Sequence, residues 1–348
     1  MNQRRKTDSS IKTFLRSLLP EKTDILDNLR LFAIILAGGV LLTPLMKRLP
    51  LAGWDWYLYF TAHNPELNLY LPDSVYPPYT RLFLHPFLWM DWRTSFSLLC
   101  SLTLVTIAFA TRRSGGSWVD IVLAIVNPPV IMLLWVGHPD GLALMGAATA
   151  FLPLAYIKPQ LTIWNALINR KWFFWTVAFL ILTLIIWPQW TFNITHFTGD
   201  IVQHRTVLFM DEATSGWAVL GWPIALLGVV LLLGAGDSPW RLMAAGSLIS
   251  PYMMPYHLSI LAPAIGAAQG WKKKLLIWLC AFLVFWGSGL RGWAKLYVIT
   301  YPLAIYCCTI SFAEYRENLK LWPVRFRNLL IHFKQRKQRL SLTREQTK

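Results

Sequence analysis

Charged residues are scarce in this chain. Only 14% of its 348 residues are Asp, Glu, Lys or Arg, whereas 55% are hydrophobic. Soluble globular domains carry about 25% charged residues, so the composition excludes an ordinary soluble protein. Acidic residues are scarcer still, with 17 Asp and Glu against 33 Lys and Arg, and the net charge is +16. We therefore expect most of the chain to face lipid or other helices.

Cysteine is equally scarce. The four cysteines lie inside apolar stretches and form neither a disulfide framework nor the ligand spacing of a zinc site. Carboxylates and histidines also form no close-spaced set for a metal ion, so we expect no metal or other cofactor. No cleavable signal peptide is evident, because the first apolar run follows some 30 polar residues. We expect that run to be retained as an anchor.

Long apolar runs, in contrast, are abundant. A helix needs about 20 mostly apolar residues to cross a membrane, and runs near this length lie at 31–46, 95–110, 119–136, 141–157, 172–190, 217–233, 275–290 and 296–312. A further apolar stretch, 241–269, is interrupted by Pro251, Pro255 and Pro263. It can form one kinked span or a hairpin of two.

The distribution of Lys and Arg favours the hairpin, because short loops rich in these residues stay in the cytoplasm. With a hairpin the chain has about ten spans, both termini are cytoplasmic, and the lysines at 272–274 fall on the same side. Asp55, Asp140 and His257 then fall on the extracytoplasmic side, and Lys158 on the cytoplasmic side. The sequence thus predicts an all-α, multi-pass protein, which we expect in a plasma membrane.

Three parts follow from this interpretation. Residues 1–28 form a basic cytoplasmic segment, 29–312 the membrane domain, and 313–348 a basic cytoplasmic tail. Within the membrane domain, 51–92 and 191–216 form large outside loops. Basic tails beside a bilayer are attracted to anionic headgroups by about 1 kcal/mol per Lys or Arg, and nothing resembles a nucleic-acid-binding module. We expect the lipid bilayer, and no nucleic acid, as a partner.

The first outside loop carries an acid among aromatic residues, since Asp55 stands between two tryptophans. Asn64-Pro65 ends any helix that begins near Asp55, and the turn Tyr76-Pro77-Pro78-Tyr79 precedes a further helical stretch at 80–90. We expect two short helices at the membrane surface.

The third run is broken by Asn127-Pro128-Pro129 and ends at Gly137-His138-Pro139-Asp140. Irregular backbone at membrane depth is tolerated only where protein or water covers it, so this end is expected to border a cavity. After the fourth run, Lys158-Pro159-Gln160 opens an apolar piece, 161–167, that is too short to cross.

These motifs, in this order, resemble the GT-C membrane glycosyltransferases, and most of all glycosyltransferase family 87, the polyprenyl-phosphate-mannose-dependent mannosyltransferases. The resemblance covers about 31–268 and rests on the order and spacing of short motifs: Gly53-Trp54-Asp55, Tyr76-Pro77-Pro78, Pro128-Pro129 before Gly137-His138, Lys158-Pro159-Gln160, and Ser250-Pro251-Tyr252 before His257. It implies metal-independent transfer of a hexose, most of all mannose, from polyprenyl phosphate to a lipid-linked or envelope glycan acceptor. The transfer would proceed with inversion on the extracytoplasmic face.

Inverting transfer needs a base that takes the proton of the acceptor hydroxyl, and Asp55 is our candidate for this catalytic role. The alternative is that Asp55 caps the helix that follows it.

The leaving group is a lipid phosphate, so cations or hydrogen-bond donors should lie where its charge develops. The candidates on the outer side are Arg81, Arg205, Arg291 and His257. Arg81 can instead anchor at the interface, and His257 can be an ordinary buried histidine.

Four further residues complete the candidate substrate-binding set. Tyr76 belongs to the proline turn of the first loop. His138 and Asp140 flank the second turn, where Asp140 can instead cap the next helix. Lys158 is expected to anchor a helix end or to contact the lipid carrier.

Two other classes of function remain open. A non-catalytic GT-C-like protein, or a transporter of lipid-linked sugars, could keep the fold without the chemistry. A transporter should show polar residues along a path through its spans and related halves, whereas here the polar residues gather on one face. A membrane scaffold would bind no lipid carrier.

Overall fold

The structure is a computed structural model that describes residues 22–61, 76–190, 216, 220–288, 298–324 and 326–327. These residues form helices and connecting turns, with no strand among them, so the prediction of an all-α fold is confirmed for this part of the chain. Arg205, Arg291 and nearly all of the second outside loop lie outside the described residues, as does most of each basic terminal segment.

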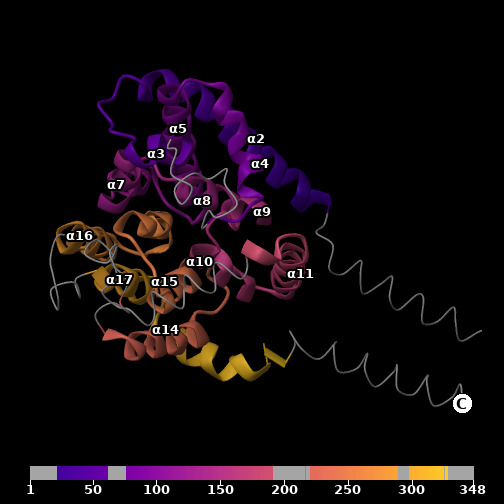
Figure 1. Ribbon diagram of the computed structural model, residues 1–348. Helices are drawn as coiled ribbons and strands as arrows, with labels where there is room; N and C mark the ends of the chain where they lie inside the picture. The colour runs from indigo at the N-terminus through magenta and orange to yellow at the C-terminus, as the bar shows by residue number, and fades with distance from the viewer. Residues whose placement is uncertain are drawn as a thin grey trace, which may run out of the picture.

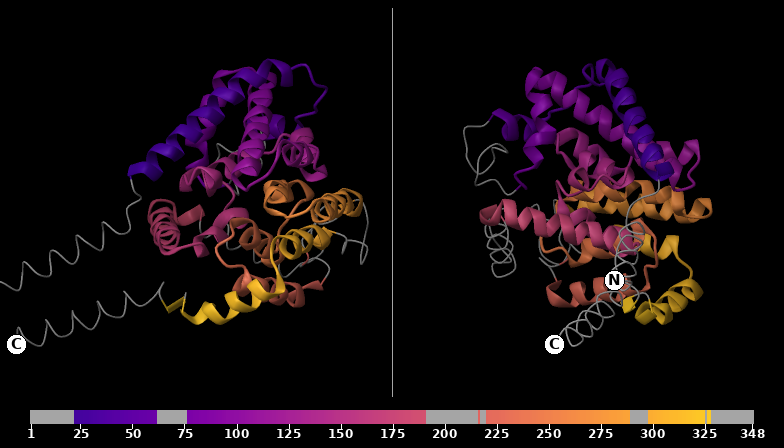
Figure 2. Two further views of the ribbon diagram at one scale, coloured as in Figure 1. Left: turned by 180° about the vertical axis from the view of Figure 1, so that it is seen from behind. Right: turned by 90° about the vertical axis from the view of Figure 1, so that its right-hand side faces the viewer.

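The helices divide into two groups (Figure 1). The first group lies in the upper part of the view and comprises α2 (Lys22–Met46), α3 (Trp54–Thr61), α4 (Thr80–Leu84), η1 (His85–Trp89), α5 (Trp92–Arg113), α6 (Trp118–Ile125), α7 (Pro128–Val136), α8 (Asp140–Ala148) and α9 (Leu152–Ala155). The second comprises α10 (Pro159–Thr162), η2 (Ile163–Leu167), α11 (Arg170–Ile186), α14 (Trp222–Gly234), α15 (Pro239–Ile249), η3 (Pro255–Ala267), α16 (Trp271–Ser288) and α17 (Thr300–Thr309). Residues 312–324 add a last helical stretch, which runs along the lower edge of both views in Figure 2.

Within the described ranges, two helices are long and apolar enough to cross a membrane, over Ile25–Met46 and Trp92–Arg113. They pack against each other, and Gly39 allows close approach, because a Cβ there would lie 2.5 Å from the Leu102 side chain. The outer face of α2 exposes large apolar side chains such as Leu41, as a lipid-facing helix does. The number of ten spans and the side of each loop remain predictions.

The predicted break in the third run is confirmed. Helices α6 and α7 meet at an angle of 53°, and together they are long and apolar enough to be one bent span. Pro128 and Pro129 begin α7, where a backbone N–H has no acceptor within the helix, so proline starts the helix without the loss of a hydrogen bond.

The fourth predicted span, 141–157, is wrong. The chain enters as α8, turns at Ala150, which has a left-handed φ of 55°, and returns through α9. The two arms touch at Gly146, where a Cβ would lie 2.0 Å from the Ala155 backbone nitrogen. Residues 140–158 therefore form a helical hairpin rather than one continuous helix.

This hairpin also corrects the position of Lys158. The prediction placed Lys158 on the opposite face from Asp140, but its Nζ lies 3.2 Å from Oδ1 of Asp140. The physical reason is that a charge at the end of an apolar run can be satisfied by a partner at the start of the same run if the run folds back.

The stretch 241–269 forms two segments, α15 and η3, and the break between them begins at Ser250. The hairpin prediction required such a break. Neither segment is long enough to count among the candidate spans. Instead η3 is almost entirely buried and packs against α5 and α7. It provides much of the contact between the two groups of helices.

Some of the basic residues expected on the cytoplasmic side lie where α5 ends and α6 begins. Arg113 and Lys171 line one cleft there together with Trp240. Lys274 bonds Asp120 at 2.7 Å, at the start of the next helix, α6. We call this region the basic end.

Candidate functional site

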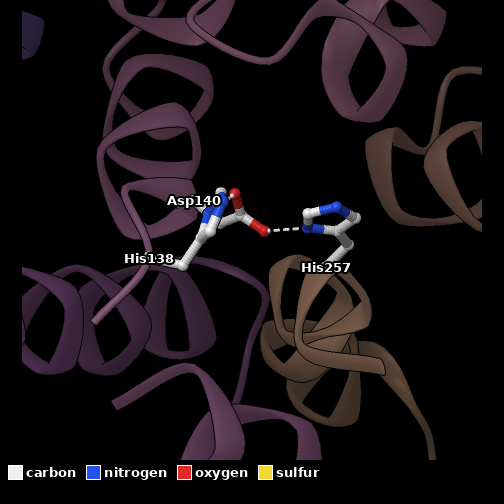
Figure 3. Close-up of side chains that lie close together, drawn as sticks. All are labelled: His138, Asp140 and His257. Atoms are coloured by element: carbon white, nitrogen blue, oxygen red, sulfur yellow. Dashed lines mark hydrogen bonds and ion pairs between the residues drawn. The ribbon is translucent and has the colours of Figure 1, made fainter. Parts of the chain in front are cut away.

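Asp140 lies at the centre of a group of buried polar side chains, which we call the Asp140 cluster: Tyr76, His138, Asp140, Lys158 and His257. Nδ1 of His138 lies 2.7 Å from Oδ1 of Asp140, and Nδ1 of His257 lies 2.6 Å from Oδ2. The ammonium of Lys158 lies 3.2 Å from Oδ1. Figure 3 shows His257 reaching the carboxylate from a different segment than His138. Of the predicted substrate-binding residues that the structure describes, all except Arg81 belong to this cluster.

A glycine turn places His138 and Asp140. Gly137 ends α7 with a left-handed φ of 78°, and a Cβ there would lie 2.7 Å from the Phe96 ring and 2.9 Å from Cβ of Trp56. Glycine is therefore required for both its conformation and its size. Asp140 then opens α8 without capping it, because its carboxylate is engaged by the two histidines.

The hydrogen bonds define the roles of the rings. If Nδ1–H of each histidine donates to the carboxylate, Nε2 of His138 is an acceptor. Two donors lie within reach of it, the hydroxyl of Tyr76 at 2.7 Å and the ammonium of Lys158 at 3.0 Å. The Lys158 ammonium lies at 3.3 and 3.4 Å from the two ring nitrogens of His257. The cluster is therefore one continuous network.

The side chains of the network differ in how far they are exposed. The side chains of Asp140 and His257 are fully buried, whereas that of Lys158 retains 6% exposure. Burial favours neutral imidazoles, and the remaining charges, Asp140 and Lys158, compensate each other. Removing one partner of such a buried pair costs about 3–5 kcal/mol because it leaves the other charge unpaired.

Asp55, the predicted base, lies beside the cluster. It is half-buried in the first turn of α3, which begins at Trp54, and so is not the residue that caps it. Its charge acts on the Lys158 ammonium. Helix α3 is fixed there by Trp56, whose Nε1–H donates to Oγ of Ser95 at 2.8 Å, and by Gly53 N–H, which donates to the Trp135 carbonyl at 2.9 Å. Three motifs that are distant in the sequence thus meet: Gly53-Trp54-Asp55, Gly137-His138 and Lys158-Pro159-Gln160.

Tyr256 is a member of the site that sequence reasoning missed. Its ring centroid lies 4.8 Å from that of His138 and 4.6 Å from that of His257. The Lys158 ammonium lies 6.0 Å from the Tyr256 ring and 5.4 Å from the Tyr76 ring, within the range of cation–π attraction. Its position next to His257 was the available signal.

The site lies beside the first half of one candidate span, α5. Gly137 contacts Phe96 and Gly141 contacts Thr103, which lie about 6 and 17 Å from the start of α5 at 1.5 Å per residue. The cluster is therefore at the depth of the first half of that helix. Arg81 lies on α4, half-buried, and we do not include it in the cluster.

His138, Asp140 and His257 are also the residues that could hold a metal ion among those the structure describes. This set corrects the expectation that carboxylates and histidines form no close-spaced group for a metal ion; in the structure its atoms are joined by hydrogen bonds. Ligand atoms around a zinc ion at about 2.0–2.2 Å lie more than 3 Å apart, whereas here they are 2.6–2.7 Å apart at hydrogen-bonding distance. The Lys158 cation also stands against the same carboxylate oxygen as His138.

No protein-family model matches the sequence, and none of the curated proteins or solved structures compared with the chain is significantly similar to it.

Proposed function

We propose that this protein is a membrane glycosyltransferase that moves a hexose, most of all mannose, from a polyprenyl-phosphate donor to a lipid-linked or envelope glycan acceptor with inversion. The observation that carries the proposal is that α3, which holds Asp55, packs through Trp56 against the Gly137 turn of the Asp140 cluster, where the Lys158 ammonium is buried. An acid near a buried cation is what we expect transfer from a lipid phosphate to use.

The two groups divide the chemistry. The Asp55 carboxylate takes the proton of the acceptor hydroxyl as that oxygen forms a bond to the anomeric carbon. The bond from the anomeric carbon to the phosphate oxygen breaks, and Lys158 stabilises the negative charge on the departing phosphate. The sealed side chains of Asp140 and His257 hold Lys158 in place.

His138 helps to position Lys158. Its Nε2 faces Lys158 and Tyr76 and accepts from them, while its Nδ1–H donates to Asp140.

The proposed orientation places the basic end in the cytoplasm, with about ten spans and both termini on that side. Short loops rich in Lys and Arg stay in the cytoplasm, and Arg113, Lys171 and Lys274 share that end. The Asp140 cluster then lies toward the extracytoplasmic face.

The test is transfer of radiolabelled mannose from polyprenyl-phosphate-mannose to endogenous lipid acceptors. Membranes carry the wild type, Asp55→Asn or, as a matched control, Asp91→Asn, which changes an exposed acid at the start of α5. We expect label to move with the wild type and the control, and at least about 100-fold less with Asp55→Asn. No transfer by the folded wild type with any polyprenyl-phosphate sugar would contradict the proposal.

A further inference from the structure

A cleft of about 870 Å³ opens at the basic end, and none of its lining residues belongs to the Asp140 cluster. It lies between the start of α2, the end of α5, the turn between α8 and α9, the start of α11 and the start of α15. The two groups of helices therefore both contribute to it. Its volume is that of a ligand site, which ranges over about 300–1,000 Å³.

The cleft lies where both candidate spans end. Asp27 and Asn28 line it near the start of the apolar span of α2, and Arg113, the last residue of α5, lies opposite. Trp172 and Trp175 also line it, and tryptophan favours headgroup depth. The cleft is thus expected at the boundary between hydrocarbon and water.

The residues that line the cleft suit an amphipathic anion as the ligand. Part of the wall is apolar, with Ala110, Leu152 and Met243. The two cations are Arg113 and Lys171, and the acid that lines the cleft, Asp27, is paired with Arg30 at 3.4 Å. Arg113 donates one bond to the Ala148 carbonyl at 2.8 Å, but a guanidinium carries five N–H donors.

A buried polar atom without a partner points to the same conclusion. Asn165 lines the cleft at 2% exposure, and its Oδ1 accepts no hydrogen bond among the described residues. Its Nδ2 has only a weak contact, 3.7 Å from Sδ of Met243. An unsatisfied buried polar atom costs about 1–3 kcal/mol, and a headgroup hydroxyl would satisfy it.

We propose that this interfacial cleft binds one anionic glycerophospholipid, with its phosphate between Arg113 and Lys171, its glycerol headgroup at Asn165 and its acyl chains along the apolar wall. Basic pockets between membrane helices bind anionic lipid headgroups in this way. The lipid bridges the two groups of helices at the end opposite the Asp140 cluster. This inference does not depend on the proposed transferase activity.

The test is lipid retention by the purified full-length protein, measured by native mass spectrometry after equilibration with equal amounts of phosphatidylglycerol and phosphatidylcholine. We compare the wild type with Lys171→Gln and Asn165→Leu, and with Lys272→Gln, which changes an exposed lysine of the basic end that does not line the cleft. We expect a single retained phosphatidylglycerol in the wild type and the control, and about fivefold weaker retention in Lys171→Gln, the equivalent of about 1 kcal/mol per cation.

Thermal unfolding in nanodiscs separates binding from folding. We expect phosphatidylglycerol to raise the unfolding temperature of the wild type and of Lys272→Gln but to raise that of Lys171→Gln less, while all are equal in pure phosphatidylcholine. Equal retention and equal stabilisation in Lys171→Gln and the wild type would overturn the proposal. So would displacement of the lipid by millimolar inorganic phosphate, which would make the site one for a free anion.

Discussion

The Asp140 cluster and the interfacial cleft differ in how far their polar groups are satisfied. In the cluster, a carboxylate, an ammonium, two imidazoles and a phenol are joined in one network with almost no exposure. In the cleft, an open space is lined by two cations and by the Asn165 oxygen, which accepts no hydrogen bond from the part of the chain that the structure describes.

This difference separates a preorganised site from one that is completed by its ligand. A satisfied buried network fixes side-chain positions before substrate arrives, which is what electrostatic catalysis needs. An unsatisfied cleft gains stability only when a ligand binds. Changes in the cluster should therefore alter the stability of the protein by itself, whereas changes in the cleft should alter it only in the presence of anionic lipid.

The largest effect is expected for Asp140→Asn. This change leaves the Lys158 cation buried beside a neutral amide, and we expect the free energy of unfolding in detergent to fall by about 3–5 kcal/mol. The double variant Asp140→Asn, Lys158→Met removes both charges and should recover most of the loss. A single variant as stable as the wild type would show that the pair carries no such energy.

Next in size is Gly137→Ala. The added Cβ would lie within 3 Å of Phe96 and Trp56 in a left-handed conformation, so we expect a loss of about 2–4 kcal/mol of stability. Gly270→Ala is the matched control, because it has the same kind of φ, 84°, and nothing within 4 Å. Equal losses in both variants would mean that strain alone, and not the contact between α3 and α7, decides.

Much of this architecture follows from the sequence. Local signals predict the helical class and the break at Pro128-Pro129, because a proline interrupts a helix at its own position. Polar residues next to apolar runs are likewise visible one by one, and these include Tyr76, His138, Asp140 and His257.

The path of the chain between Asp140 and Lys158 could not be predicted in the same way. Hydropathy measures how apolar a run is, and a helical hairpin buried in protein is as apolar as a crossing helix. What distinguishes them is the contact of Gly146 with Ala155 and the ion pair that closes the hairpin. Both are tertiary interactions that periodicity does not encode.

Tyr76→Phe is expected to have a moderate effect. It removes the hydroxyl that lies 2.7 Å from His138 Nε2 and keeps the ring beneath the Lys158 ammonium, so we expect a loss of about 1 kcal/mol of stability. Tyr76→Leu removes the ring as well and should cost more. If Tyr76→Phe costs nothing, Lys158 alone satisfies the acceptor, and the phenol is not part of the preorganised network.

The smallest effect is expected outside both sites, at Asp91. Its side chain accepts from the Thr94 hydroxyl and backbone N–H at the start of α5, and these bonds lower the pKa of the carboxyl below its ordinary value. A group with a lowered pKa stabilises the folded state above its unfolded pKa and loses that contribution as the pH falls through the folded value. The unfolding temperature of Asp91→Ala should therefore be slightly below that of the wild type at neutral pH, and the difference should shrink below about pH 4. A difference that stays constant down to that pH would mean that the Asp91 cap acts through its shape and not through its charge. The charge of Asp91 would then contribute nothing to the stability of the start of α5.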